Sequence, residues 1–163
     1  MTTFICKKLE KLNVSRNSLG DIFLAYLATS KYLKKLKDLK MRKCGFDEPA
    51  MMKLFCSSMV MSELISLDLS ENQLGNSGCA SLSEPRYLRR LKGLCLSNVG
   101  LTDPAVIARF GDCTAYCKLR RLDIGNNKFT SSVIPVLIKC NFFFHLRELM
   151  LTRALMSAWK RIN

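Results

Sequence analysis

The chain has 163 residues and a formal net charge of +13 at pH 7, because 26 Lys and Arg residues stand against 13 Asp and Glu residues. Its first residues contain no apolar run of seven or more, and no stretch resembles a membrane span, so we expect neither a secretory signal nor a transmembrane helix. Eight cysteines scattered through a chain without an export signal predict reduced thiols and a cytoplasmic location.

One leucine pattern, Leu-x-x-Leu-x-(apolar), occurs six times. Its first leucines are Leu9, Leu36, Leu64, Leu91, Leu119 and Leu146, so the period is 27 or 28 residues. A fixed period in this range is typical of a strand-plus-helix unit stacked on copies of itself. The pattern predicts an α/β fold, a curved leucine-rich-repeat solenoid of about six repeats with a concave parallel β-sheet and convex helices. We expect one domain over residues 1–163, with a degenerate C-terminal end at residues 152–163.

The first five repeats open with eleven residues that match the form L-x-x-L-x-L-x-x-[N/C]-x-L closely, and positions are counted here as places from the first leucine. Side chains alternate across a strand, so places four and six point into the core and places three, five and seven face outward. Place nine is Asn17, Asn72 and Asn127 in the first, third and fifth repeats, where an amide can bond the backbone of a turn. Cys44 and Val99 occupy it in the second and fourth repeats.

Apolar residues at helical spacing follow the strands of four repeats and predict convex helices whose stripes face the core. These residues are Ile22, Phe23, Tyr26 and Leu27; Met51, Met52, Leu54 and Phe55; Val106, Ile107 and Phe110; and Val133, Ile134 and Leu137. In the third repeat, Gly75 and Gly78 followed by Pro85 predict a short or mobile helix.

The repeats alternate in kind, so the full sequence period is 55 residues. Glu48 and Pro49 in the second repeat correspond to Asp103 and Pro104 in the fourth, and each pair predicts an N-cap followed by proline at the first helical position. This alternation of two repeat kinds, with Asn or Cys at place nine, resembles the ribonuclease-inhibitor-like leucine-rich repeats, which are also found in NOD-like receptors. The resemblance covers roughly residues 9–155. It implies a protein-interaction role, as an inhibitor or as a sensing or autoinhibitory arm, but the charge of +13 argues against an inhibitor of basic ribonucleases.

The two ends of the stack are expected to need covers, because terminal repeats otherwise leave the core open to water. At the N-terminus, Phe4 and Ile5 could cover the first leucine. At the C-terminus, Met156, Trp159 and Ile162 could fold back as a lid. The alternatives are that the chain is a fragment or isoform of a larger receptor or regulator, or that it associates end to end with itself.

Basic residues concentrate beside the repeat leucines, within two positions before or after them. Because these positions stack from repeat to repeat, they predict a basic rim along the edge of the sheet where the strands begin. We assign to this basic rim Lys34, Lys35, Lys37, Arg89, Arg90, Lys92 and Arg120. The third repeat interrupts it with Ser62, Glu63, Ile65 and Ser66. The rim is either a site for an acidic partner or a solvated edge that keeps the chain in solution.

The outward places of the strands form the second candidate surface, the concave face. The candidate partner-binding residues on it are Lys11, Asn13, Arg16, Lys40, Arg42, Lys43, Asp68, Glu71, Asn98, Arg121, Asp123 and Asn126. Their charge is basic in the first two repeats, acidic in the third and nearly neutral in the fourth. Such mixed polarity favours a protein partner with an acidic surface over nucleic acid or an anionic membrane.

Residues suited to catalysis are few. His145 is the single histidine and is expected at the rim, and Cys113 and Cys117 have no second ligand pair for zinc. We therefore predict no enzyme activity, no metal and no cofactor.

Two other functions remain open. One is a GTPase activator similar to the Ran GTPase-activating proteins, although the acidic tail of that family is missing. The other is a substrate-recognition arm of a ubiquitin ligase, although the repeats are longer than is usual there.

Overall fold

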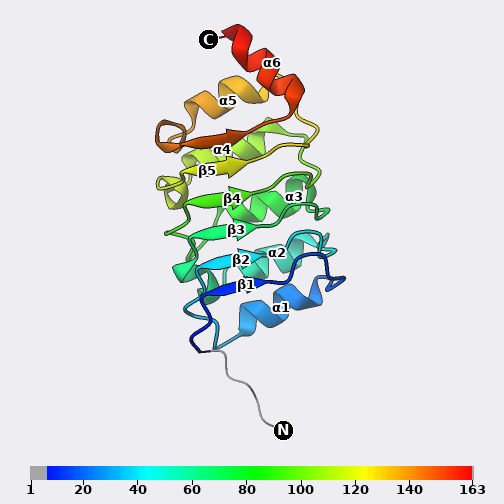
Figure 1. The fold of residues 1–163 in the computed structure, drawn as a ribbon, viewed down its shortest axis with the longest axis vertical. Helices are drawn as coiled ribbons and strands as arrows, with labels where there is room; N and C mark the ends of the chain where they lie inside the picture. The colour runs from blue at the N-terminus through cyan, green and yellow to red at the C-terminus, as the bar shows by residue number, and fades with distance from the viewer. Residues whose placement is uncertain (1–6, 163) are drawn as a thin grey trace.

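The computed structural model describes residues 7–162. Its strands form one parallel sheet in chain order: β1 (Lys11–Asn13), β2 (Asp38–Lys40), β3 (Ser66–Asp68), β4 (Gly93–Cys95), β5 (Arg121–Asp123) and β6 (Glu148–Met150). The α-helices are α1 (Ile22–Thr29), α2 (Pro49–Cys56), α3 (Gly75–Ala80), α4 (Pro104–Asp112), α5 (Val133–Lys139) and α6 (Arg153–Ile162). Short 3-10 helices precede the later strands: η1 (Met59–Glu63), η2 (Ser81–Ser83), η3 (Thr114–Tyr116) and η4 (Phe143–His145). Figure 1 shows the strands stacked as rungs with helices behind them, which confirms the predicted solenoid.

The leucines at place four set the register of the sheet. Leu12, Leu39, Leu67, Leu94, Leu122 and Leu149 are Cα partners from strand to strand. The four inner leucines are fully buried, whereas Leu12 and Leu149, at the two ends, are only partly buried. Each repeat therefore completes its core with its neighbours, as stacked repeats must.

The asparagines at place nine tie odd repeats to the even repeats before them. Asn72 is buried; its Oδ1 accepts the N–H groups of Cys44 at 2.8 Å and Phe46 at 3.3 Å, and its Nδ2 donates to the carbonyls of Met41 and Leu69. Asn127 makes the equivalent four bonds in the fifth repeat. The predicted bonding of place nine to the turn backbone is confirmed, and it extends to the backbone of the neighbouring repeat.

The predicted helix starts of the second and fourth repeats are confirmed. The N–H of Ala50 donates to Glu48 and the N–H of Ala105 donates to Asp103 at 2.8 Å, while Pro49 and Pro104 are the first helical residues. The third-repeat helix α3 has six residues, so the predicted short helix is also confirmed. Within residues 7–162, no helix is both long enough and apolar enough to cross a bilayer.

We expect Asp103→Ala to lower the free energy of unfolding by about 1 kcal/mol, because the substitution removes the N-cap bond of α4. Urea denaturation followed by circular dichroism measures this change. Asp112→Ala is the matched control, since Asp112 lies at the other end of α4 and is exposed. The N-cap assignment is wrong if the two variants unfold at the same urea concentration.

The predicted stripes of α1 and α2 were wrong at three positions. Ile22 is 60% exposed, Tyr26 is 68% exposed and Leu54 is 43% exposed, whereas α1 buries Leu24 and Leu27. The physical reason in α1 is that it is the first helix of the described stack. It packs on α2, and no helix within residues 7–162 covers its other side. The stripes of α4 and α5 lie inside the stack and are buried as predicted.

The C-terminal lid is present in part. Leu155 of α6 is buried, and the Trp159 ring lies 5.6 Å from that of Phe143. Met156, by contrast, is 39% exposed, and a cavity of about 240 Å³ remains between α6 and β6. Phe4, Ile5 and the side chain of Ile162 lie outside the described residues. End-to-end association therefore stays a prediction.

Candidate protein-interaction surface

The outward side chains at place five alternate in role along the concave face. In the odd repeats, Asn13, Asp68 and Asp123 each accept the N–H group two residues further on, at 2.9 to 3.0 Å. These oxygens hold the backbone where it leaves the strand, in the manner of an Asx turn. In the even repeats, Lys40 and Cys95 occupy the same place. Three predicted binding residues therefore have a structural role as well, whereas Lys40 is exposed and makes no such bond to the turn.

A second row of predicted residues lies at place eight, where the backbone adopts the left-handed conformation. Arg16, Lys43, Glu71, Asn98 and Asn126 all have positive φ, between 53° and 63°. In the first four repeats, the N–H of place eight donates to the place-seven carbonyl of the next repeat, for example Arg16 to Arg42 at 2.7 Å. This bond fixes the left-handed turn at the same point in each repeat. The side chains of place eight consequently leave the sheet edge from equivalent positions.

Cations without acidic partners gather on the first two repeats. Lys11, Arg16, Lys40 and Lys43 are all exposed, and none has an ion pair within the described chain. The structure therefore brings these four predicted residues together on one part of the concave face, in β1, β2 and the turns that follow them.

Three acids lie close to these cations: Asp38 and Asp68 are the strand partners of Lys11 and Lys40, and Glu71 in the next turn is paired with Arg42. The guanidinium of Arg42 donates to Glu71 Oε1, and this bond holds the pKa of Glu71 below its usual range and raises that of Arg42. Arg42 is half-buried, and its Nε has no hydrogen-bond partner within the described chain. The acidic character predicted for the third repeat is thus reduced, and the basic region of the concave face is bordered by an internally balanced pair.

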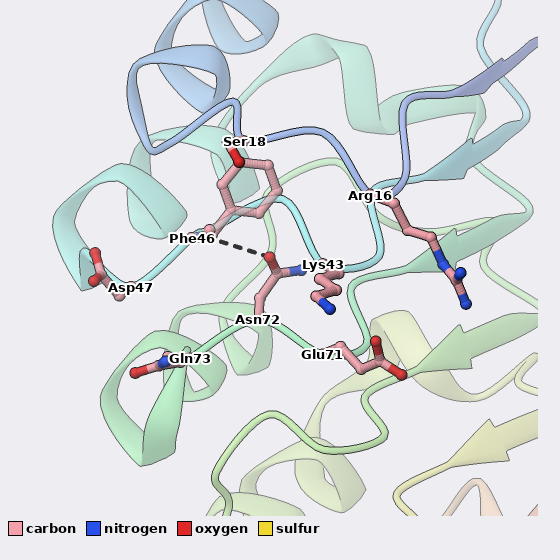
Figure 2. Close-up of a pocket in the computed structure, with 9 residues that line it drawn as sticks. Arg16, Ser18, Lys43, Phe46, Asp47, Glu71, Asn72 and Gln73 are labelled. Atoms are coloured by element: carbon pink, nitrogen blue, oxygen red, sulfur yellow. Dashed lines mark hydrogen bonds between the residues drawn. The ribbon is translucent and has the colours of Figure 1, made fainter.

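A pocket of about 420 Å³ opens beside this cationic region. Figure 2 shows Arg16, Lys43 and Glu71 coming from three successive turns, while Phe46 donates its N–H to Asn72 behind them. Ser18, Asp47 and Gln73 also line the pocket and were not predicted from the sequence. They lie one to three positions after place nine in neighbouring repeats, so an alignment of the repeats could have identified them.

The basic rim is partly neutralised by pairs between neighbouring repeats. Lys37 contacts Glu10 at 2.7 Å and Arg90 contacts Glu63 at 2.6 Å. Arg120 donates to the carbonyls of Leu119 and His145, both at 3.3 Å. The remaining rim residues, Lys34, Lys35, Arg89 and Lys92, are exposed and have no ion pair in the part of the chain that the structure describes. Exposed pairs of this kind stabilise a fold by less than about 1 kcal/mol.

The C-terminal part of the concave face carries few free charges. Arg121 pairs with Glu148 at 3.3 Å, and Asp123 bonds the turn as described above. Asn126 donates to Ser97 Oγ at 3.4 Å, and Asn98 is exposed. This end of the face therefore offers amides more than charges.

The thiols of the described chain are unsuited to nucleophilic chemistry where they are buried. Burial raises the pKa of Cys56 and Cys79 to about 12, and burial together with Asp68 and Asp123 raises that of Cys95 to about 11. A thiol with so high a pKa stays protonated at neutral pH and reacts slowly. No group of His, Cys, Asp and Glu side chains within residues 7–162 is arranged to hold a metal ion.

Comparison with known families agrees with this geometry. Two family models, both described as Leucine Rich Repeat, match the chain, one at residues 6–22 and 62–83 and the other at residues 118–140. The chain contains leucine-rich repeats. A search of curated proteins found no match.

Two solved leucine-rich-repeat-like structures share the fold. The tropomodulin C-terminal domain from Caenorhabditis elegans has a TM-score of 0.53 at 15% identity, over 97% of this chain and 82% of that one. The leucine-rich-repeat ectodomain of the plant membrane receptor kinase GASSHO1/SCHENGEN3 from Arabidopsis thaliana, solved in complex with CASPARIAN STRIP INTEGRITY FACTOR 2, has a TM-score of 0.52 at 22% identity. That match covers 89% of this chain and only 18% of the ectodomain. Proteins with such repeats commonly mediate protein–protein interactions, through the concave surface that the solenoid presents.

Proposed function

We propose that the chain is a non-enzymatic interaction module that binds a protein partner with an acidic surface. The binding surface is the concave face of the first two repeats, extended by the pocket beside it and by the N-terminal part of the basic rim. The observation that carries this proposal is the group of Lys11, Arg16, Lys40 and Lys43, which are exposed and lack acidic partners within the described residues. Unpaired cations on a rigid scaffold steer and orient an acidic partner.

The mixed chemistry around these cations supports a protein partner. Asp47, Gln73 and Ser18 line the same pocket as Arg16 and Lys43, so donors, acceptors and both signs of charge lie within one small region. A uniform polyanion would be repelled by the acids, whereas an acidic peptide with its own amides and carbonyls can satisfy all of these groups. The binding of CASPARIAN STRIP INTEGRITY FACTOR 2 by the plant ectodomain is a precedent for partner binding by this fold.

We also propose that the repeats are of the ribonuclease-inhibitor-like kind and that the protein is cytoplasmic. The alternation of repeat kinds supports the first proposal. Positive-φ glycines directly follow place nine in the second and fourth repeats, at Gly45 and Gly100, whereas in the first and third repeats they come three positions after place nine, at Gly20 and Gly75. The second proposal rests on cysteine usage, since the seven cysteines within the described residues are free thiols.

The double variant Lys40→Glu/Lys43→Glu tests the binding surface. The probe is an acidic peptide selected from a random display library against the purified protein, with its Kd measured by fluorescence anisotropy. We expect the double variant to raise the Kd about tenfold, because two attractive contacts become repulsive. Lys53→Glu/Lys139→Glu is the control, since it changes the net charge equally on the convex helices α2 and α5. A library that yields no enrichment of Asp and Glu, or a Kd that the two double variants change equally, would contradict the proposal.

A further inference from the structure

At the C-terminal end of the sheet edge that carries the basic rim, three cations are stacked without an acid between them. Lys92, Arg120 and Arg147 occupy place two of the fourth, fifth and sixth repeats. The N–H of Arg120 donates to the Lys92 carbonyl at 2.8 Å, and the N–H of Arg147 donates to the Arg120 carbonyl at 2.7 Å. The three residues are therefore direct neighbours across strands about 4.8 Å apart.

The nearby acids do not neutralise this stack. Glu63 is paired with Arg90 and Glu148 with Arg121, so each carboxylate already has its own cation. Arg89 and Lys118 add two more exposed positive charges beside the same repeat leucines. Like charges side by side on a sheet repel one another, and an anionic surface outside the protein would relieve that repulsion.

An exposed aromatic side chain lies on the same edge. Phe144 precedes the sixth repeat leucine by two positions, and it is 82% exposed, more than any other large apolar side chain of the described residues. The neighbouring Phe142 is buried, and the Phe143 ring lies edge-on to the ring of Phe144, at 6.4 Å between centroids.

A contact joins this aromatic segment to the stacked cations. The guanidinium of Arg120 donates to the carbonyl of His145 at 3.3 Å, and His145 ends the 3-10 helix η4 that carries Phe144. The middle cation of the stack therefore contacts the 3-10 helix from which the ring of Phe144 projects. Folding of the described chain does not account for an aromatic ring held in water at this point.

We infer that this edge docks on an anionic lipid membrane, with Phe144 entering the headgroup region and the four exposed cations Arg89, Lys92, Lys118 and Arg147 facing acidic lipid headgroups. Aromatic rings favour the membrane interface, and basic residues next to it are attracted by the negative surface potential. An acidic protein would need a hollow to receive the ring, whereas a bilayer accepts it directly. Single-stranded nucleic acid would favour several aromatic platforms, and this edge offers one fully exposed ring. The inference is independent of the concave-face proposal.

Co-sedimentation with lipid vesicles tests the inference. The full chain is mixed with vesicles of phosphatidylcholine alone, or of phosphatidylcholine with phosphatidylserine, at low and at high salt. We expect binding to the phosphatidylserine vesicles only, weakened by salt as charge screening requires. Lys92→Glu/Arg147→Glu should lower the partition constant about tenfold or more, since each basic residue near such a surface contributes about fivefold.

Two matched variants separate a local site from a general effect of charge or hydrophobicity. Lys34→Glu/Lys35→Glu changes the net charge equally at the N-terminal part of the rim and should retain most of the binding. Phe144→Ser should weaken binding about tenfold, whereas Tyr26→Ser, at an exposed aromatic of α1, should not. All these side chains are exposed, so the fold, checked by circular dichroism, should persist. Absence of binding at low salt, equal losses in the two charge variants, or unchanged binding by Phe144→Ser would each overturn the inference.

Discussion

Asn72→Ala is expected to lower the free energy of unfolding by about 3–4 kcal/mol. The side chain is buried and makes four bonds of 3.3 Å or less to the backbone, two as acceptor and two as donor. Alanine leaves the N–H groups of the buried residues Cys44 and Phe46 without their partner, and each such group costs about 1–3 kcal/mol. Urea denaturation, followed by circular dichroism, measures the loss.

Asn17→Ala is the matched control for this prediction. Asn17 occupies the same place in the first repeat, but it is exposed, and it donates only to the carbonyls of Val14 and Ser15. Within the described residues, no repeat precedes it to supply N–H groups for its Oδ1. We expect a loss of about 1 kcal/mol or less. Similar losses in the two variants would show that the bonds between repeats contribute little.

Gly111→Ala is expected to destabilise the protein by about 2–3 kcal/mol through overpacking. Gly111 is buried near the end of α4, where it meets the residue that follows α5. A Cβ at this position would lie 2.8 Å from the Cβ and 2.9 Å from the Cα of Cys140. Backbone atoms cannot move aside as a flexible side chain can, so the two helices would have to separate. Thermal unfolding followed by circular dichroism should show a clearly lower Tm.

Gly93→Ala controls for the general effect of adding a methyl group. Gly93 lies in β4, and a Cβ there would meet only Ser66 Oγ, at 3.9 Å, which is an ordinary contact. Its φ is not positive, so alanine fits the backbone. We expect an unchanged or slightly higher Tm. An unchanged Tm in Gly111→Ala as well would mean that α4 and α5 do not approach as closely as described.

The repeat spacing alone was enough to predict the sheet, its register and the bonded asparagines. A period of 27 or 28 residues forces equivalent side chains into neighbouring rungs, so Asn72 and Asn127 follow from the alignment. The stripe of α1 could not be predicted in this way. Which side of a helix is buried depends on the neighbour it packs against. Among residues 7–162, α1 has a helical neighbour on one side only, so Ile22 and Tyr26 are exposed.

The sequence predicted which residues form the candidate surface, but it did not predict which of their charges are paired. The outward places identified Lys40, Lys43 and the rest from strand alternation. The pairing of Arg42 with Glu71 joins residues 29 positions apart, and it depends on side-chain conformations that a repeat pattern does not contain. The same holds for Phe144, since the spacing places it at the edge of the sheet but does not indicate which way the ring points.

The buried asparagines also have a consequence for how such an array can change its length during evolution. The amide of an odd repeat is matched to the free N–H groups of an even repeat, as Asn72 is to Cys44 and Phe46. Gain or loss of a single repeat would place two repeats of one kind side by side. Either an asparagine would then lack N–H groups to accept, or the N–H groups of a turn would lack an asparagine. Duplication of a 55-residue pair, by contrast, preserves every match. The heritable unit of this solenoid is therefore the pair of repeats, although the geometric unit is the single one.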